Sequence, residues 1–306
     1  MLIDKELALV EATLKEAVKS NVEFLSQMGE YISRSGGKRL RPKVVLLSYL
    51  AAGGEDATLA VPLAAAVELL HTASLVHDDI NDCSDQRRGQ ETINARWGTD
   101  LAILTGDFIF VKMLNLVNTF ELKVRQQLTD CCAAIIEGET LQAMNQGNTA
   151  MSKDLYLEIV GKKTASLFSA CARMGAVFAA GTEQAAAALG TYGSNLGVAF
   201  QIRDDTLDQI GKADDLGKPA TVDLDQGKMN LATLFVLSSP AKAKFLSAKN
   251  KDEAIKVLDE AGALEYAMHK AEEYIDRAKA ALWILPESEI RTALCEQADF
   301  AVARNC

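Results

Sequence analysis

Two short acidic stretches, Asp78-Asp79-Ile80-Asn81-Asp82 and Asp204-Asp205-Thr206-Leu207-Asp208, organise the rest of the chain. Each follows an apolar segment with helical spacing, and each begins and ends with aspartate. Residues i and i+4 lie on one face of a helix, so each stretch presents a pair of carboxylates on the same side. Two such faces turned toward one another would line a cavity with oxygen ligands. This arrangement suits Mg²⁺, which completes its shell with water and with the phosphates of a ligand.

Composition favours a helical globular protein. The 306 residues are 49% hydrophobic and include only 5 prolines, while Ala, Leu, Glu and Lys are abundant. The net charge of −10 argues against general affinity for nucleic acid or an anionic membrane. The 6 cysteines form no C-x-x-C motif, which excludes a zinc site of that type and fits a reducing cytosol. No signal-peptide core and no 18-residue apolar run stands out, so we expect a cytoplasmic protein without stable membrane insertion.

Hydrophobic periodicity predicts helices along almost the whole chain. The expected helical segments are 4–33, 43–51, 60–80, 101–118, 121–144, a helix starting at Ser152, an Ala-rich segment at 176–200 and most of 230–306. The first acidic stretch ends its helix, where the helix dipole disfavours carboxylates, so a cation is needed nearby. A long polar loop follows Asp208, and we interpret it as a lid over the second stretch. One all-helical domain, residues 1–306, is the simplest account.

Cations accompany both acidic stretches. They occur in Gly36-Gly37-Lys38-Arg39-Leu40-Arg41-Pro42, at Arg87 and Arg88, at Lys163-Thr164 inside an apolar helix, and at Lys218 and Lys228 in the loop. Taken alone, the first group is also compatible with a solvated basic loop, and Lys163 with a lysine that extends to solvent. Beside carboxylates suited to a metal, these residues indicate an anion site, because Lys and Arg bind phosphate oxygens.

Together these motifs resemble the trans-polyprenyl diphosphate synthases. The matching residues are Gly36 to Pro42, His77-Asp78-Asp79-x-x-Asp82-x-Ser84-x-x-Arg87-Arg88-Gly89-x-x-Thr92, Lys163-Thr164, Phe200-Gln201-x-x-Asp204-Asp205-x-x-Asp208, Gly217-Lys218-Pro219 and Gly227-Lys228. The likeness extends to the C-terminus, where Arg304 also fits. It implies an all-α, isoprenoid-synthase-type bundle of ten or more helices around a central cavity, usually as a homodimer.

The resemblance implies a reaction, the head-to-tail 1′-4 condensation of isopentenyl diphosphate onto an allylic diphosphate, with farnesyl diphosphate as the expected primer. Three Mg²⁺ ions would assist ionisation. The implied ligands are Asp78 and Asp82 for two ions and Asp204 and Asp208 for the third, with Asp79 and Asp205 in support. The allylic diphosphate would be held by Arg87, Lys163 and Lys218. Isopentenyl diphosphate would be held by Lys38, Arg41, His71 and Arg88. The reacting region would be lined by Thr164, Gln201 and Lys228.

Product length is predicted from the helix below the first stretch. In this family the residues one turn and more before the first aspartate face the growing chain, and here they are Ala73 and Ser74. A turn rises about 5.4 Å, so both would lie just below the metals. Members that stop at fifteen carbons have a large aromatic residue there. We therefore expect a product of about thirty to forty carbons or more, such as octaprenyl diphosphate, which can pass to a membrane after release. Candidates for the floor of the tunnel are Leu70, Tyr49, Phe108 and Phe110.

Some features depart from the family pattern or leave alternatives open. Thr221 replaces a usual Gly, and Asn230-Leu231-Ala232 replaces Thr-Leu-Pro, both in or beside the lid. A shorter-chain farnesyl or geranylgeranyl diphosphate synthase remains an alternative, as does a non-catalytic partner subunit, although such subunits lose an acidic motif. A class I terpene cyclase would carry a different second metal motif. A di-iron bundle needs two E-x-x-H pairs, and the chain offers Glu68-x-x-His71 alone.

Overall fold

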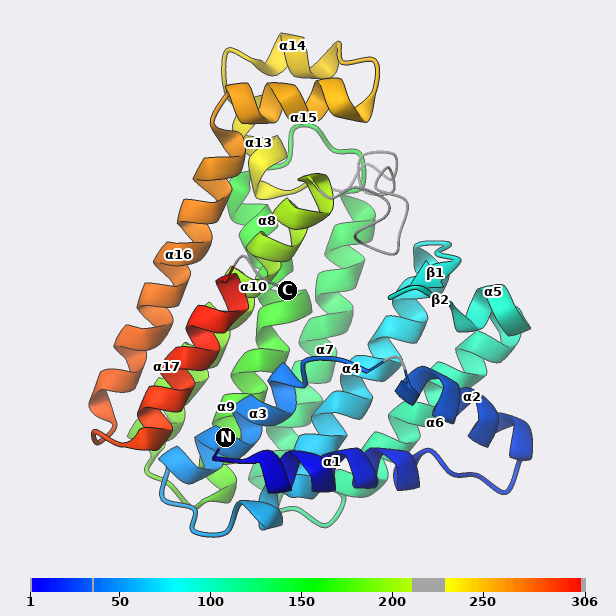
Figure 1. Cartoon of the computed structure of the whole chain (residues 1–306), viewed down its shortest axis with the longest axis vertical. Coiled ribbons are helices and arrows are strands. Elements are labelled where there is room, and N and C mark those ends of the chain that lie inside the picture. The colour runs from blue at the N-terminus through cyan, green and yellow to red at the C-terminus, as the bar shows by residue number, and fades with distance from the viewer. Residues whose placement is uncertain (1, 35, 211–228, 304–306) are drawn as a thin grey trace. The chain divides into compact units, whose positions relative to one another are not determined.

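The structure is a computed structural model that describes residues 2–34, 36–210 and 229–303. These residues form more than ten α-helices and one short hairpin (Figure 1), so the predicted all-α fold is confirmed. The helices are α1 (Asp4–Ala17), α2 (Glu23–Arg34), α3 (Leu40–Ala51), α4 (Val61–Asn81), α5 (Ile93–Trp97), α6 (Thr99–Val117), α7 (Leu122–Met144), α8 (Lys153–Val160), α9 (Ser166–Phe178), α10 (Glu183–Ile210), α13 (Leu231–Leu237), α14 (Lys242–Leu246), α15 (Lys251–Glu260), α16 (Ala263–Ala281) and α17 (Glu289–Val302). The remaining elements are the 3-10 turns η1 (Ala57–Ala60) and η3 (Leu282–Ile284), the π turn η2 (Gly161–Ala165), and the strands β1 (Gln86–Arg87) and β2 (Gln90–Glu91).

The helix boundaries follow the sequence signals closely. Ser152 caps α8 as predicted, because its hydroxyl oxygen accepts a hydrogen bond from the N–H of Leu155 (3.1 Å). Gly262 and Pro286 fall between helices, also as predicted. The Ala-rich segment 176–200 is interrupted, since α9 ends at Phe178 and the next residues turn before α10 begins.

Contacts group the residues into two compact units. The first contains Met1–Leu128, Ala170–Leu189 and Leu285–Leu294, and the second contains Thr129–Ser169, Gly190–Ile284 and Cys295–Cys306. The boundaries between the two fall inside α7, α9, α10 and α17, and at the end of η3. The expectation of a single domain over residues 1–306 stays a prediction.

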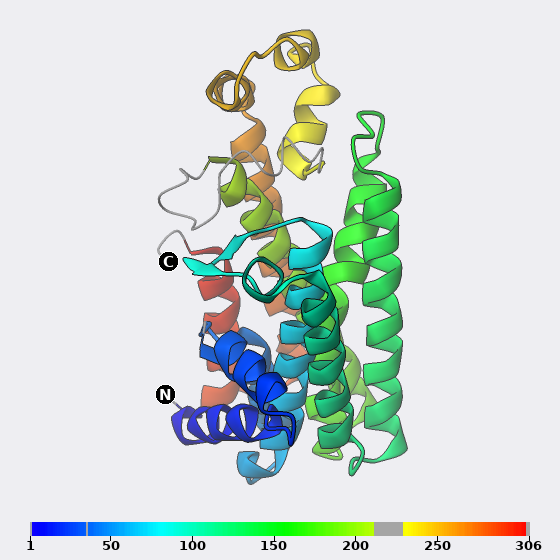
Figure 2. The ribbon, with the colours of Figure 1, turned by 90° about the vertical axis from the view of Figure 1, so that its right-hand side faces the viewer.

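Helix α4 is the core of the first unit. Its residues from Leu63 to Leu70 are all buried, and it packs on α1, α3 and α6. Pro62 lies in its first turn, where a missing backbone N–H costs nothing. The N-terminal helix α1 runs across α4 (Figure 2).

Contrary to the expectation from the sequence, one segment is long and apolar enough to cross a membrane. It is Ala57–Asn81, with a mean hydropathy of 1.7. In this fold 67% of its apolar window is buried inside the protein, and the core helix of a globular protein meets the same criteria. The apolar character of the segment is therefore explained by its place at the centre of the first unit.

The second unit is built around the C-terminal part of α10. Small residues let its neighbours approach closely, because a Cβ at Gly197 would lie 2.5 Å from the Cα of Ala165 and one at Gly193 would lie 2.3 Å from the carbonyl oxygen of Phe168. Helices α13, α14, α15 and α16 pack on one another at one end of this unit (Figure 1). Close contact between α10 and the segment after α8 is what brings their polar side chains together.

Candidate active site

The first acidic stretch closes α4 with a tight hydrogen-bonded cap. The helix ends at Asn81, and Cys83 has a left-handed backbone (φ 49°). The N–H of Cys83 donates to the carbonyl of Ile80 (3.1 Å), and that of Ser84 donates to the carbonyl of Asp79 (2.9 Å). This is the pattern of a Schellman motif, which satisfies the last carbonyls of a helix. The acidic side chains are thereby fixed at a helix C-terminus, as predicted.

The three aspartates of this stretch have different environments. Asp79 is buried (3% exposed), and its carboxylate accepts a hydrogen bond from Nε of Arg87 (2.8 Å). Asp78 and Asp82 are half-buried and lie one turn apart. Arg87 therefore supplies the positive charge that carboxylates at a helix C-terminus require. The contact uses one of the five N–H donors of the guanidinium group, so Arg87 can be held by Asp79 and still bind an anion.

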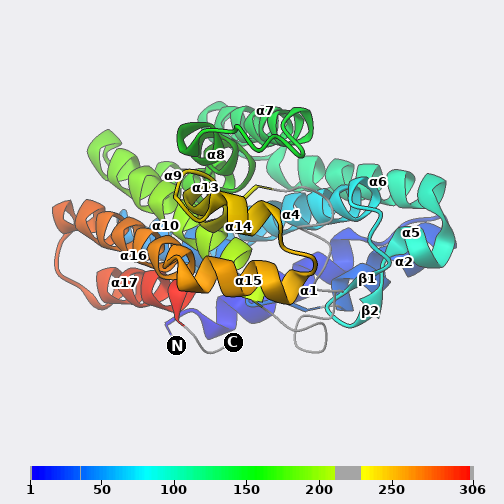
Figure 3. The same cartoon turned by 90° about the horizontal axis from the view of Figure 1, so that it is seen from above.

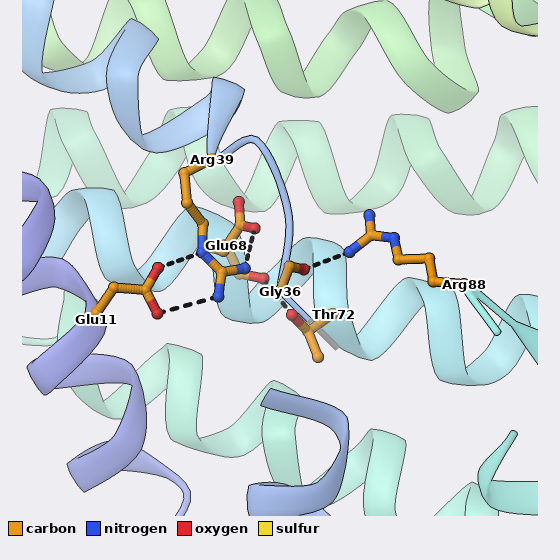
Figure 4. A network of polar contacts seen from close by, with 6 residues as sticks. All are labelled: Glu11, Gly36, Arg39, Glu68, Thr72 and Arg88. Atoms are coloured by element: carbon orange, nitrogen blue, oxygen red, sulfur yellow. Dashed lines mark hydrogen bonds and ion pairs between the residues drawn. The ribbon is translucent and has the colours of Figure 1, made fainter. Parts of the chain in front are cut away.

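Arg87 and Arg88 are presented by the hairpin β1–β2. Its register pairs Arg87 with Gln90, so Arg88 and Gly89 form a two-residue turn. Both turn residues have positive φ (52° and 74°), as a type I′ turn requires. The exposed Arg88 reaches across to donate a hydrogen bond to the carbonyl of Gly36 (Figure 4). The hairpin is thus joined to the basic loop at 36–39.

The same hairpin lies beside α2 (Figure 3), and aromatic side chains hold the two together. The hydroxyl of Tyr31 donates to the carbonyl of Glu91 (3.0 Å). The Tyr31 ring packs edge-on against Trp97 with ring centroids 5.0 Å apart. The guanidinium of Arg96 lies 4.8 Å from the centroid of each of these two rings. The hairpin therefore has a rigid support, which is what an anion-binding arginine needs.

The basic loop before α3 is anchored by a buried ion pair (Figure 4). Nη1 of Arg39 lies 2.9 Å from Oε1 of Glu68, and Nη2 lies 3.1 Å from Oε2 of Glu11. The side chains of Arg39 and Glu68 are only 14% and 7% exposed. Burial by itself lowers the pKa of Arg39, but the two carboxylates outweigh it and the pKa is raised. One of the three cations in this loop is therefore structural, and the loop is not simply solvated.

His71 lies among the arginines of the loop and the hairpin. It is half-buried, and burial is the main cause that lowers its pKa well below the ordinary value. Four positive side chains lower it further: Arg41, Arg88, Arg87 and Arg39. His71 is therefore neutral at pH 7, in a strongly positive field. Of the other residues predicted to bind isopentenyl diphosphate, Lys38 is exposed and Arg41 is half-buried. The first unit thus brings Arg41 and Arg88 close to His71, and their binding of isopentenyl diphosphate stays a prediction.

The two positions predicted to set product length carry no bulk. Ala73 is 2% exposed, and the half-buried Ser74 turns its hydroxyl to the backbone carbonyl three residues earlier (2.9 Å). Among the candidates for the tunnel floor, Tyr49 belongs to an aromatic cluster. Its ring lies 5.5 Å from that of Phe178, which in turn lies 4.8 Å from Phe120.

The second acidic stretch lies near the C-terminal end of α10. Asp204 is exposed, and Asp205 and Asp208 are half-buried. Both carboxylate oxygens of Asp205 accept hydrogen bonds, Oδ1 from the amide of Gln201 (2.7 Å) and Oδ2 from the hydroxyl of Tyr156 (2.6 Å). The middle aspartate is held in place in this stretch, as it is in the first. The remaining pair, Asp204 and Asp208, shares one helix face.

Lys163 and Thr164 lie in the π turn between α8 and α9. Single π turns inside α-helices occur frequently at functional sites. The hydroxyl of Thr164 donates to the side-chain carbonyl of Gln201 (2.7 Å), so two residues predicted to line the reacting region are in contact. This bond continues the network that ends on Asp205.

Lys163 is paired with side chains of α7. Its ammonium lies 2.6 Å from Oε1 of Glu139 and 2.9 Å from Oε1 of Gln142. Helix α7 approaches very closely here, since a Cβ at Gly138 would lie 2.5 Å from the backbone nitrogen of Lys163. The lysine is thus positioned rather than extended freely into solvent. Its predicted contact with the allylic diphosphate stays a prediction.

Several expected residues lie outside the described part of the chain: Lys218, Lys228, Thr221 and Arg304. The departure at Asn230 is described, and it keeps a helix cap. Its Oδ1 accepts the N–H of Thr233 (2.9 Å) at the start of α13. Asn and Thr are both good N-cap residues, so this replacement conserves the local structure.

The carboxylates fit a cation that arrives with a phosphate. Within residues 2–34, 36–210 and 229–303, no group of three His, Cys, Asp or Glu side chains lies close enough to hold a metal ion alone. Each acidic stretch instead offers a pair of carboxylates. Mg²⁺ is usually bound through one or two carboxylates, with water and substrate phosphates completing its shell. The donor set is therefore suitable for Mg²⁺ bridged to a diphosphate.

Sequence patterns assigned no separate role to Arg39 in the first unit, or to Glu139 and Tyr156 in the second. A signal existed for Arg39, because Glu68 is a carboxylate in the middle of an apolar helix and such a group must be paired when buried. Tyr156 stands in an apolar run and resembles an ordinary core aromatic residue. Its hydroxyl group is the one feature that predicts a hydrogen-bond partner when the ring is buried.

Comparison with known proteins agrees with this geometry. Residues 22–265 match the family described as polyprenyl synthetase. Octaprenyl diphosphate synthase of Escherichia coli (strain K12) is 35% identical over 98% of this chain and 96% of its own. A short chain isoprenyl diphosphate synthase of Methanothermobacter thermautotrophicus is 36% identical over 99% of this chain and 98% of its own.

A solved structure supports the same assignment. The polyprenyl synthase of Caulobacter crescentus, complexed with calcium and isoprenyl diphosphate, superposes with a TM-score of 0.94 at 38% identity, covering 100% of this chain and 96% of that one. The predicted resemblance is thereby confirmed: the chain belongs to the trans-polyprenyl diphosphate synthase family, whose members are divalent-metal-dependent prenyltransferases that join isopentenyl diphosphate to an allylic diphosphate.

Proposed function

We propose that the protein makes a long-chain polyprenyl diphosphate of about thirty to forty carbons or more, starting from farnesyl diphosphate. The observation that carries the chain length is the absence of bulk at Ala73 and Ser74 of α4. The octaprenyl relative supports this proposal. The short-chain relative is just as similar in sequence, so the local residues, rather than overall identity, must decide product length. A farnesyl or geranylgeranyl diphosphate synthase is the alternative.

The residues divide between two diphosphate groups. In the first unit, isopentenyl diphosphate is bound by Lys38, Arg41, His71 and Arg88. The allylic diphosphate is bound by Arg87, Lys163 and Lys218. Because His71 is neutral, it contributes a hydrogen bond while the arginines supply the charge. Two Mg²⁺ ions would be held by Asp78 and Asp82, and a third by Asp204 and Asp208. When bound, Mg²⁺ withdraws charge from the allylic diphosphate and favours breaking of its C–O bond.

The chain's own side chains then determine the course of the reaction. Positive groups that are held in place stabilise charge on the departing diphosphate without reorganising. Arg87 is held by Asp79, and Lys163 by Glu139, so both fit this requirement. Thr164 and Gln201, which are hydrogen-bonded to each other, would line the reacting region together with Lys228, which lies outside the described residues. Apolar walls keep water from the allylic cation.

A homodimer in the cytoplasm is part of the proposal. Helix α6 carries four exposed apolar side chains with roughly helical spacing: Ile103 (43%), Leu104 (56%), Val111 (52%) and Leu114 (44%). Exposed apolar side chains on one helix support contact with a second subunit. A non-catalytic partner role is disfavoured because both acidic stretches are complete.

Product analysis tests the proposal. The protein is incubated with Mg²⁺, farnesyl diphosphate and labelled isopentenyl diphosphate, and the products are separated by reversed-phase thin-layer chromatography. Label should appear in products longer than geranylgeranyl diphosphate. Ala73→Tyr should shorten them, while Ser74→Ala, which keeps its position small, should leave their length unchanged. No incorporation by the unmodified protein would exclude a synthase, and unchanged products from Ala73→Tyr would exclude the assigned tunnel.

A further inference from the structure

Tyr156 is a buried polar side chain that the proposed reaction does not use. It lies on α8 and is 3% exposed. Its hydroxyl donates to Oδ2 of Asp205 at 2.6 Å. Burial first, and then the neighbouring Asp205 carboxylate, raise the pKa of Tyr156 well above the ordinary value. The hydroxyl is therefore protonated at neutral pH and acts as a fixed donor to the acidic stretch.

The hydrogen bond from Tyr156 completes a network in which every hydrogen bond leads toward the carboxylate of Asp205. Thr164 donates to the carbonyl oxygen of Gln201 (2.7 Å), and the amide of Gln201 donates to Oδ1 of Asp205 (2.7 Å). Tyr156 donates to the other oxygen of the same carboxylate. An ionised carboxylate is a pure acceptor, so all three bonds are satisfied when Asp205 is ionised. Charge-assisted bonds of this kind fix a carboxylate more firmly than neutral ones.

The π turn explains how one helical segment supplies both ends of the network. Residues eight apart in an α-helix differ by about 80° in direction, so Tyr156 and Thr164 would not share a face. Thr164 lies within the π turn at Gly161–Ala165, which begins after Tyr156 and inserts about one extra residue into the helix. The difference then falls to about 20°. Both side chains consequently face α10, where Gln201 and Asp205 are one turn apart.

We infer that Tyr156 is a positioning residue for the second acidic stretch, which holds Asp205 aside so that Asp204 and Asp208 form the carboxylate pair for the cation. The inference rests on the proposed function, since it concerns how that site is kept in order. The first stretch has the same design, with Arg87 bound to its middle aspartate. The donor to Asp79 is the cationic Arg87, whereas one donor to Asp205 is the neutral hydroxyl of Tyr156.

Tyr156→Phe removes the hydroxyl and little else. Residues that orient metal ligands without touching the metal typically change metal affinity by about 10–100-fold. We expect the Mg²⁺ concentration for half-maximal activity to rise about 10-fold or more, with the KM for isopentenyl diphosphate unchanged. The increase in melting temperature caused by Mg²⁺ with inorganic diphosphate should shrink by at least half. Tyr192→Phe is the matched control. Tyr192 is fully buried, and it lies on α10 about 18 Å along the helix from Asp204.

The outcomes separate the inference from the proposed function. If the unmodified protein does not incorporate label, the proposed function fails. If the unmodified protein is active, the role of Tyr156 is refuted when Tyr156→Phe leaves the Mg²⁺ concentration for half-maximal activity and the ligand-induced increase in melting temperature unchanged. It is also refuted when Tyr156→Phe alters these two quantities no more than Tyr192→Phe does. Should Tyr156→Phe fail to fold, 3-fluorotyrosine at position 156 keeps the hydroxyl. Its fluorine resonance should move when Mg²⁺ and inorganic diphosphate bind, and an unmoved resonance overturns the inference.

Discussion

Replacing Arg39 by glutamine should destabilise the protein more than any exposed ion pair can. The change leaves the carboxylate of Glu68, only 7% exposed, without the guanidinium that lies 2.9 Å from it. An uncompensated buried charge costs about 3–5 kcal/mol. Glu11 is 38% exposed, so water solvates it and its loss of a partner adds little. Unfolding entropy of about 2.1 cal/mol/K per residue gives about 0.6 kcal/mol/K for 306 residues, so the melting temperature should fall by about 5–8 °C.

Differential scanning fluorimetry of three variants, compared with the unmodified protein, tests this reasoning. Arg173→Gln is the control, because Arg173 and Glu183 form an exposed ion pair (41% and 77%) that is worth at most about 1 kcal/mol. Glu68→Gln together with Arg39→Gln should recover at least half of the loss, since the stranded charge is gone. The single variant should also lose less stability at pH 5, where a stranded carboxylate can take up a proton. Equal, small shifts for Arg39→Gln and Arg173→Gln would show that burial of the Glu68 pair carries no special weight.

Three further changes probe other parts of the two units. Gly138→Ala should abolish most activity, because its Cβ would lie 2.5 Å from the backbone of Lys163. Gly161→Ala, in the π turn that contains Lys163, has open space around the new Cβ and should be active. Equal activities of the two variants would contradict this reasoning. Because the pKa of His71 is lowered in the folded protein, the unfolded chain protonates this side chain more readily. The contribution of neutral His71 to the free energy of unfolding is therefore fully present above about pH 6.5. Below that pH it falls by up to about 1.4 kcal/mol per pH unit. His71→Gln should remove that part of the decline in melting temperature between pH 7 and 5, and parallel curves for the two proteins would refute the assignment. Cys83→Gly should raise stability by about 1 kcal/mol, measured by urea denaturation, because glycine adopts the left-handed C-cap without strain; a loss of stability would argue against this.

Much of the fold could be predicted from the sequence because its signals are local. The segments expected at 101–118 and 121–144 are α6 and α7 to within two residues, since the apolar period and the intervening polar residues mark both ends. The cap at Ser152 likewise depends only on nearby residues. The interruption after Phe178 was harder to see, because alanine favours helix and Ala180 nevertheless adopts a left-handed backbone (φ 53°).

Side-chain partners could not be predicted in the same way, because tertiary packing selects them. The sequence does not distinguish the three cations of the basic loop, Lys38, Arg39 and Arg41. Arg39 becomes the structural one because Glu68 of α4 lies beside it in the folded protein. The pairing of Lys163 with Glu139 depends on how closely α7 passes the π turn. Hydrophobic periodicity in the sequence reveals neither the π turn nor this close approach. The sequence therefore predicts which charges gather near the site but not which of them hold the site together.

In both acidic stretches the second aspartate is paired with a hydrogen-bond donor from elsewhere in the chain. At about 100° per residue, the second aspartate points about 100° away from the first, whereas the fifth residue lies only about 40° away. The first and last carboxylates can therefore share a cation, and the middle one is directed toward the protein. A carboxylate turned inward is costly unless it is hydrogen-bonded. Arg87 satisfies Asp79, and Tyr156 with Gln201 satisfies Asp205. An acidic run on a solvated surface has no need of such partners, so the donors to Asp79 and Asp205 favour the prediction that these stretches bind a cation.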